Sequence, residues 1–286
     1  MASGFSRYAA ALLAGMALAA CAAAPAPAPA PPPAPAASTA PGGPPRNPAP
    51  GYLGANAAQL LSVMPPAPRD GDARDEADRR IFRDTRALMG SARWRMAADD
   101  AELGSAAMLR HFSCSLGIEL TPQQAPRMVA MLQKATRDGA QAMIKGKDLY
   151  QRKRPYKVME GEICRPREEL GESFDYPSGH TTAGWTWGMV LAQVAPERAV
   201  PILTRGRSIG DSRIICGVHN TSAVEGSRLL TTAVLAAVMA TPEYQSDLAA
   251  ARAELAGLRG QPHAEPDPAR CEEEARLIAT PLPIAP

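Results

Sequence analysis

YPSGHTT, the sequence of residues 176–182, is the most informative stretch of the chain. Pro177 and Gly179 are typical of a turn, and residues 181–194 are rich in apolar side chains. We therefore predict a loop that opens into a buried helix, with Ser178 and Gly179 at the N-cap and His180 in the first turn. A helix N-terminus presents unpaired backbone N–H groups and a partial positive charge, which favour an anion.

The predicted helix start has the chemistry of a phosphate site. Gly179 has no side chain to keep an oxyanion away from the backbone N–H groups. His180 can give or take a proton near neutral pH. Taken alone, this pattern is weak, because most Pro-Ser-Gly turns before helices bind nothing.

Composition favours one all-α domain. The chain has 286 residues, of which 45% are hydrophobic and 5% aromatic, so a sizeable core can form and helices are favoured over sheets. The net charge is +2 with no broad basic face, and we expect no nucleic-acid partner. Helical periodicity or apolar runs predict helices over residues 57–63, 70–89, 94–110, 121–143, 186–194 and 229–239. Thr121 is the predicted N-cap of the fourth of these.

The first 21 residues predict a signal peptide. Arg7 precedes a short apolar run over residues 9–20, and small residues lead up to Cys21. Residues 18–21, LAAC, resemble a bacterial lipoprotein box, which implies that Cys21 is lipidated. Ala22, rather than aspartate, follows the cysteine and points to the outer membrane. The alternative is an ordinary signal peptide that contains a cysteine.

The remaining chain divides by composition. Residues 22–50 are mostly alanine and proline and predict a disordered tether. Residues 51–260 carry the predicted helices and form the expected domain. Residues 261–286 are rich in proline and glutamate and predict a surface tail.

Four further cysteines suggest an exported protein with two disulfides. Cys114, Cys164, Cys216 and Cys271 allow three pairings, which the sequence cannot rank. A zinc site is the competing interpretation, but no pair has the short spacing of zinc ligands. Cys271 predicts that part of the tail is tied to the domain.

Three clusters stand out along the chain. Each has an ordinary explanation as a charge run, a helix start or an apolar segment with a core histidine. Their order and internal spacing are far more specific than any one of them. The clusters occupy residues 147–155, 176–182 and 210–219.

Together the clusters resemble the type 2 phosphatidic acid phosphatase superfamily, and within it the bacterial class A non-specific acid phosphatases. The likeness rests on Lys147 followed by Arg154-Pro155, on residues 177–180, and on Ser212-Arg213 with His219 six residues later. It extends from about residue 60 to residue 255 and implies a compact all-α fold. Membrane-spanning relatives are set aside, because we expect no stretch after the signal region to be long enough to span a bilayer.

The resemblance implies that five residues hold phosphate. Three cations surround its oxygens, and the Ser178 hydroxyl and the Gly179 backbone complete the cradle. A transferring phosphoryl group spreads charge over three oxygens, so fixed positive charge can stabilise it without a metal or another cofactor. The five residues are Lys147, Arg154, Ser178, Gly179 and Arg213.

The resemblance also implies that both motif histidines react. His219 would attack phosphorus and form a phosphohistidine, and His180 would protonate the leaving group and later activate water. This requires a neutral His219 and a protonated His180 at the start. His111 and His263 match no motif and are expected to be structural or surface residues.

The chain departs from the family pattern at one position. The family places an aspartate four residues after the nucleophilic histidine, where it orients the imidazole, but this chain has Ala223 there. Glu225 would point about a third of a turn away on a regular helix. Ala223→Asp is therefore expected to raise turnover, unless another group already orients His219.

The sequence thus predicts a periplasmic acid phosphatase for small phosphomonoesters, anchored to the outer membrane by Cys21. Homo-oligomer formation is left open. One alternative is a non-catalytic phosphate-binding envelope lipoprotein, which Ala223 favours and the retained cations oppose. A second is a vanadium-dependent haloperoxidase, which shares the same pocket and ranks lower because the match is to the compact phosphatases.

Overall fold

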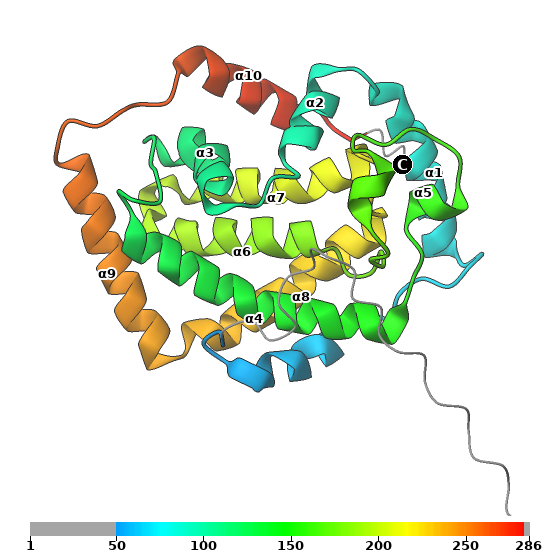
Figure 1. The fold of residues 1–286 in the computed structure, drawn as a ribbon, viewed down its shortest axis with the longest axis horizontal. Coiled ribbons are helices and arrows are strands. Elements are labelled where there is room, and N and C mark those ends of the chain that lie inside the picture. The colour runs from blue at the N-terminus through cyan, green and yellow to red at the C-terminus, as the bar shows by residue number, and fades with distance from the viewer. Residues whose placement is uncertain (1–49, 283–286) are drawn as a thin grey trace, which may run out of the picture. The chain divides into compact units, whose positions relative to one another are not determined.

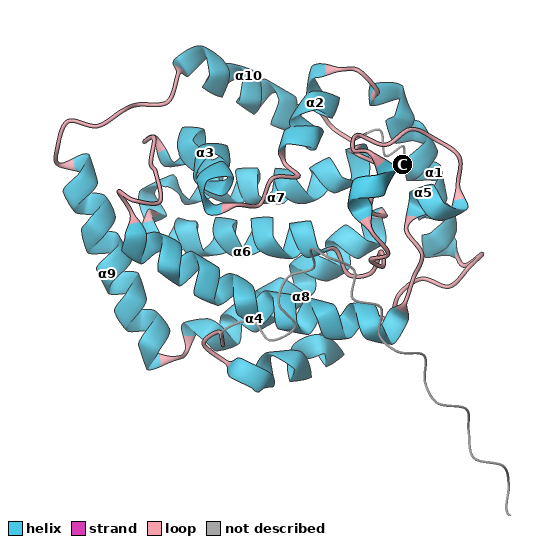
Figure 2. Ribbon diagram, in the orientation of Figure 1, coloured by secondary structure: helices cyan, strands magenta, loops and turns pink. Residues whose placement is uncertain are grey.

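The computed structural model describes residues 50–282, and in this range the chain forms ten α-helices and no strand (Figure 2). The predicted all-α fold is confirmed. The signal peptide, the lipidation site at Cys21 and nearly all of the tether lie outside the described residues.

The helices follow one another with short connections, apart from the loop of residues 159–178 (Figure 1). Short 3-10 helices span Gly54–Val63 (η1), Arg86–Leu88 (η2), Arg167–Leu170 (η3) and Pro196–Arg198 (η4). The α-helices are α1 Ala73–Thr85, α2 Ala92–Asp99, α3 Ser105–Leu116, α4 Pro126–Tyr150, α5 Pro155–Val158, α6 Gly179–Val194, α7 Ala199–Ile215, α8 Thr221–Met239, α9 Pro242–Arg259 and α10 Pro268–Ala279.

Helices α6 and α7 run antiparallel at the centre of the fold (Figure 1). They approach closely where two glycines meet, because a Cβ built on Gly188 would lie 3.1 Å from the Gly206 Cα. Since α6 and α7 are antiparallel, the N-terminus of α6 and the C-terminus of α7 lie at one end. The C-terminus of α4 and the N-terminus of α8 reach that same end, so three distant sequence clusters meet there.

Local sequence signals placed some helix ends wrongly. The helix expected over residues 57–63 is the 3-10 helix η1, and residues 94–110 divide between α2 and α3. Thr121 is not the N-cap of α4. Its N–H and hydroxyl donate to Gln124 Oε1, each at 2.9 Å, which closes a turn, and α4 begins later at Pro126. Proline at the first helical position is favourable, because its missing N–H would be unpaired there in any case.

Helix α8 corrects the argument about membrane spans. By length and composition alone its 19 residues could cross a bilayer, with a mean hydropathy of 1.2, because the helix begins at Thr221 rather than near residue 229. More than half of this apolar window is buried, and α8 packs on α4, α6 and α7. Packing in the protein core therefore accounts for its composition.

Two disulfides join the four cysteines of the domain. Cys114 pairs with Cys271 and ties α10 to α3, as expected for a fixed C-terminal segment. Cys164 pairs with Cys216, and the Cys164 N–H also donates to the Cys216 carbonyl at 3.1 Å. This second bridge fastens the long loop of residues 159–178 to the turn that follows α7.

Candidate active site

Ser178 begins α6, as the sequence predicted. Its side chain accepts a hydrogen bond from the Thr181 N–H at 3.4 Å, and the residue is fully buried. Its own N–H donates to Ser227 Oγ on α8 at 2.6 Å and lies 3.3 Å from the Ala223 carbonyl. The Ser178 N–H therefore fixes the start of α6 to a side chain and a carbonyl of α8.

Gly179 has a packing role that the sequence did not indicate. A Cβ at this position would lie 3.3 Å from the Met143 Cε on α4. That contact is tight for a real side chain, and a residue larger than glycine here would require the Met143 methyl group to move slightly. Glycine at this position therefore fits the space beside Met143 as well as leaving the backbone N–H groups open.

His180 is partly exposed, and its ring is held by the α2–α3 connection. Its Nε2 lies 3.1 Å from the Ala101 carbonyl. Because a carbonyl can only accept, Nε2 carries the proton and Nδ1 is left for other chemistry. The neighbouring Asp100 is fully buried and accepts from Ser212 Oγ at 2.6 Å and from Arg205 Nη2 at 2.5 Å, which fixes this connection to α7.

Lys147 and Arg154 come from the end of α4 and the start of α5. The Lys147 Nζ donates to the Phe174 carbonyl, and Arg154 donates through Nε to the Ser173 carbonyl at 2.8 Å. Arg154 Nη1 also donates to the Val218 carbonyl, next to His219, at 3.2 Å. Both cations are largely buried, with exposed fractions of 9% and 7%.

The turn from Arg213 to His219 is held by a backbone hydrogen bond and by Arg86. The His219 N–H reaches back to the Arg213 carbonyl at 3.3 Å. Arg86 Nη2 donates to the Ile215 carbonyl at 2.7 Å and so caps the end of α7. Gly217 has a φ of +77°, and a Cβ there would overlap the Arg86 guanidinium at 2.3 Å, so the turn requires glycine.

Two of the predicted side chains carry buried polar atoms without partners. The Nε and Nη1 of Arg213 and the Nε2 of His219 have no hydrogen-bond partner among residues 50–282. Arg213 and His219 are 1% and 2% exposed. A buried donor left unpaired is costly, and native proteins seldom contain one without a reason. An anionic ligand would accept hydrogen bonds from the two Arg213 nitrogens.

The pKa shifts of the two motif histidines indicate that the predicted residues lie close together. Burial, and then the charges of Arg154, Lys147 and Arg213, lower the pKa of His219 well below its usual value. Burial of the ring, then Arg213 and then His219, lower the pKa of His180 in the same way. Effects of this kind require the side chains to lie near one another.

The cations also act on one another. Burial, with the charge of Arg154 next, lowers the pKa of Lys147 to about 7. Burial and Arg154 lower the pKa of Arg213 to about 9. Like charges that crowd in a buried space favour either deprotonation or a bound anion.

A carboxylate that the sequence analysis missed contacts His219. Asp175 Oδ1 lies 3.1 Å from His219 Nδ1 and accepts from the Asn220 N–H at 3.0 Å. Its Oδ2 accepts from Asn220 Nδ2 at 2.9 Å and from Arg152 Nη1 at 3.2 Å. Burial raises the pKa of Asp175, while Arg152 and Asn220 act against this effect.

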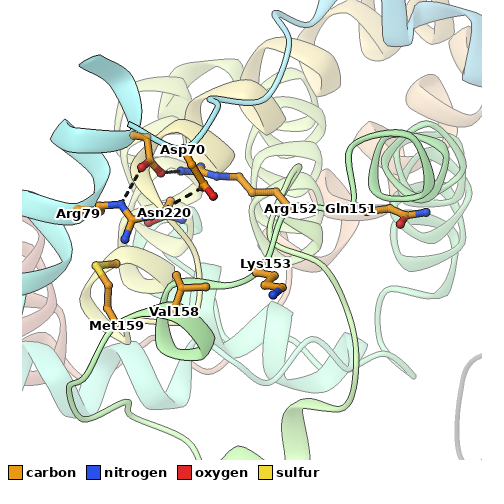
Figure 3. A pocket seen from close by; sticks show the side chains of 9 residues that line it. Asp70, Arg79, Gln151, Arg152, Lys153, Val158, Met159 and Asn220 are labelled. Carbon is orange, nitrogen blue, oxygen red and sulfur yellow. Dashed lines mark hydrogen bonds and ion pairs between the residues drawn. The ribbon is translucent and has the colours of Figure 1, made fainter. Parts of the chain in front are cut away.

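Arg152 joins this carboxylate to α1. It donates to Asp78 Oδ2 at 2.9 Å and to Asp75 Oδ1 at 2.8 Å. Figure 3 shows Arg152 reaching the side of a cavity of about 280 Å³ that Asn220 and Arg79 also line. The charged helix predicted over residues 70–89 therefore directs Asp75 and Asp78 toward Arg152. This arginine lies between Lys147 and Arg154 in the sequence.

The other two histidines have structural or surface positions, as expected. His111 is buried, and its Nε2 donates to the Glu102 carbonyl at 3.1 Å. His263 is exposed and contacts the Gln261 carbonyl. Within residues 50–282, no group of three or more His, Cys, Asp and Glu side chains is arranged to hold a metal ion.

Residues 130–247 match the PAP2 superfamily, and this range contains every residue predicted to hold or attack phosphate. An acid phosphatase of Zymomonas mobilis is 36% identical over 217 residues, which cover 75% of this chain and 81% of the relative. The chain belongs to the acid phosphatases of the PAP2 superfamily. The non-specific acid phosphatases of Salmonella typhimurium and Providencia stuartii are 35% and 32% identical over 67% and 71% of this chain, and 78% and 83% of theirs.

Membership in this family makes the protein an acid phosphatase, as the three clusters predicted. The relatives align with most of their own length, so the assignment concerns the whole helical domain rather than a shared motif. The named activity agrees with the chemistry of the site, where buried cations and two imidazoles occupy the end of the domain at which α4, α6, α7 and α8 meet.

Proposed function

We propose that this acid phosphatase hydrolyses small phosphomonoesters through a phosphohistidine on His219, without a metal. One observation carries the proposal: His219 Nε2 is buried and unpartnered among residues 50–282, as are two guanidinium nitrogens of Arg213. Lys147 and Arg154 add charge to the same site. Three cations supply the positive charge that metal ions provide in other phosphoryl-transfer enzymes.

The first chemical step forms one bond and breaks another. The lone pair of His219 Nε2 attacks phosphorus, a P–N bond forms, and the P–O bond to the alcohol breaks. The leaving oxygen takes a proton from His180. Water then attacks the phosphohistidine, His180 accepts its proton, and the P–N bond breaks to release phosphate. The lowered pKa of His219 supports this sequence, because a nucleophile must be neutral at the working pH.

His180 becomes an acid when substrate binds. In the free protein the ring is neutral at neutral pH, because burial and Arg213 lower its pKa. A bound phosphate ester places negative charge beside the ring, and an opposite charge raises the pKa of a base. Since Nε2 donates to the Ala101 carbonyl, the transferred proton would sit on Nδ1. Substrate binding thus protonates the group that must protonate the leaving oxygen.

We also propose that the domain, residues 51–260 with the following tail, is held in the periplasm by lipidated Cys21 and the tether of residues 22–50. The lipoprotein-like sequence LAAC and the two disulfides of an exported protein support this. The test expresses the full chain in a Gram-negative host with labelled fatty acid. Cys21→Ser should lose the label and leave the outer-membrane fraction, whereas labelling that persists would refute lipidation.

Hydrolysis of p-nitrophenyl phosphate by the mature protein, with a chelator present throughout, tests the mechanism. His219→Ala should abolish turnover and His180→Ala should reduce it by about 10²-fold or more. His263→Ala, an exposed histidine, serves as the matched control and should leave the rate unchanged.

Trapping of the intermediate supplies a second readout. Labelled substrate followed by an alkaline detergent quench should leave a phosphoprotein that acid removes and base does not. Its absence from wild type, or its presence in His219→Ala, would contradict the covalent mechanism. Phosphate binding without any turnover would favour a non-catalytic binding protein instead.

A further inference from the structure

We infer that Asp175 is the positioning residue of the nucleophile: its carboxylate fixes the ring and the tautomer of His219. This inference rests on the proposed role of His219. Asp175 comes from the loop before α6, three residues before Ser178 and 44 before His219. The charged partner of the imidazole therefore comes from the residue just before the cluster of residues 176–182 rather than from the helix that follows His219.

The Asp175 carboxylate is fully buried and its hydrogen-bonding capacity is filled. Oδ1 accepts from the Asn220 N–H and faces His219 Nδ1, and Oδ2 accepts from the Asn220 side chain and from Arg152. The three contacts from Asn220 and Arg152 are all donors, and one of them is a charged guanidinium 3.2 Å from Oδ2, which favours the ionised carboxylate over the neutral acid. We therefore infer an ionised Asp175, in which Arg152 and Asn220 oppose the effect of burial.

An ionised Asp175 sets the tautomer of His219. A carboxylate accepts but cannot donate, so the proton of the neutral imidazole stays on Nδ1 at 3.1 Å from Oδ1. The lone pair then lies on Nε2, the atom that is buried and without a partner among residues 50–282. The anion also stabilises the positive charge that the ring gains as the P–N bond forms.

The two positions on α8 do not supply this carboxylate. Ala223 has only a methyl group and is fully buried, and its carbonyl accepts from Ser227 Oγ at 2.7 Å. Glu225 is exposed. Asp175, from another loop, thus takes the orienting role expected of residue 223. His219 remains oriented although position 223 has no carboxylate.

Arg152 holds Asp175 in turn. Its guanidinium forms ion pairs with Asp175, Asp78 and Asp75, so one side chain links the site to α1. The Asp175 N–H donates to the Arg152 carbonyl at 2.8 Å, so backbone and side chain of both residues are tied together. Rigid support of this kind is what a positioning residue requires.

Asp175→Asn is the decisive variant, because it keeps the size of the side chain. The amide presents one acceptor and one donor to two pairs of donors, so either orientation sets an N–H against a donor. With the amide N–H toward His219, the ring proton moves to Nε2 and the nucleophile is blocked. We expect kcat to fall by about 10²–10⁴-fold and KM to change by less than about threefold.

Asp138→Asn is the matched control. Asp138 is another fully buried aspartate, on α4, which accepts from the Tyr52 and Leu53 N–H groups and has no hydrogen bond to a residue of the site among the described residues. Its replacement should lower the melting temperature and leave kcat within about threefold of wild type. Melting curves of both variants separate loss of fold from loss of orientation.

Nitrogen-15 NMR of labelled histidine gives a readout that does not depend on activity. Wild type should show His219 protonated at Nδ1, and Asp175→Asn should shift the population toward Nε2–H. The inference is overturned by an unchanged tautomer, or by a folded Asp175→Asn protein with kcat near wild type. If wild type lacks phosphatase activity, the proposed function fails, while the tautomer shift still decides whether Asp175 orients the ring.

Discussion

Lys147 should control how anion binding depends on pH. Its pKa is lowered to about 7, because the ammonium is buried beside Arg154. In the free protein the side chain therefore loses its charge as the pH rises above about 7, and at pH 8 roughly one-tenth remains protonated. A site that relies on this charge binds phosphate esters best below neutral pH, in keeping with an acid phosphatase.

The size of the effect follows from one charged hydrogen bond. Such a bond contributes about 1.5–3 kcal/mol, so its loss weakens binding by about 10-fold to 150-fold. The dissociation constant should rise about tenfold per pH unit above pH 7 until it reaches that limit. Sulfate is the suitable probe, because it keeps its double negative charge between about pH 5 and pH 9.

Lys147→Arg is the comparison that isolates the lysine. Arginine keeps its charge throughout this pH range, and both proteins retain the same histidines, so the ratio of their sulfate inhibition constants reports Lys147 alone. The ratio of wild type to variant should be constant from pH 6 to about pH 7 and then rise. Parallel pH profiles for the two proteins would refute the reasoning.

The unligated protein offers an independent check of the sign. The unfolded lysine titrates near 10.5, so between about pH 7 and that value the unfolded chain binds more protons than the folded one. The contribution of Lys147 to the free energy of unfolding should therefore rise with pH across this window. Lys147→Met, which cannot titrate, should lose that rise in urea titrations.

Three further predictions concern the scaffold. Ala223→Asp should not raise turnover, contrary to the expectation from sequence, since Asp175 already contacts His219; a second buried carboxylate should instead lower the melting temperature, and faster hydrolysis would refute this. Replacement of Cys164 and Cys216 by serine should lower the free energy of unfolding by about 4 kcal/mol, from closure of a 52-residue separation; an unchanged urea midpoint would contradict it. Gly188→Val should cost about 1–3 kcal/mol in the same titration, because its Cβ meets the facing glycine of α7, whereas a neutral result would show that the helices can separate.

The sequence predicted what depends on local order. The start of α6 follows from Pro177, Ser178 and Gly179, which specify a turn and an N-cap within four residues, and the structure has the helix there. The order and spacing of the three clusters predicted the family to which the chain belongs. Burial of the apolar segments that became α6 and α8 followed from composition alone.

Contacts between distant residues were beyond the sequence. Asp175 lies beside the recognised cluster, yet no spacing rule relates it to His219, because a search for an orienting carboxylate along the helix reaches only residues three or four positions away. The one available signal for Asp175 in the sequence was its position as a carboxylate directly before the cluster of residues 176–182. Arg152 was hidden for the same reason, since its aspartate partners on α1 are more than 70 positions earlier.

The partners of the two motif histidines explain how similar rings could take different roles. His219 faces an anion through Nδ1, which keeps a lone pair on Nε2 and favours a ring that gains positive charge during attack. His180 faces a neutral carbonyl through Nε2, so nothing in the free site favours its charged form. In the proposed mechanism, the negative charge of the bound phosphate ester therefore favours the protonated ring. In the proposed mechanism Asp175 and Ala101 thus distinguish the two roles, because burial, Arg154 and Arg213 lower the pKa of both rings.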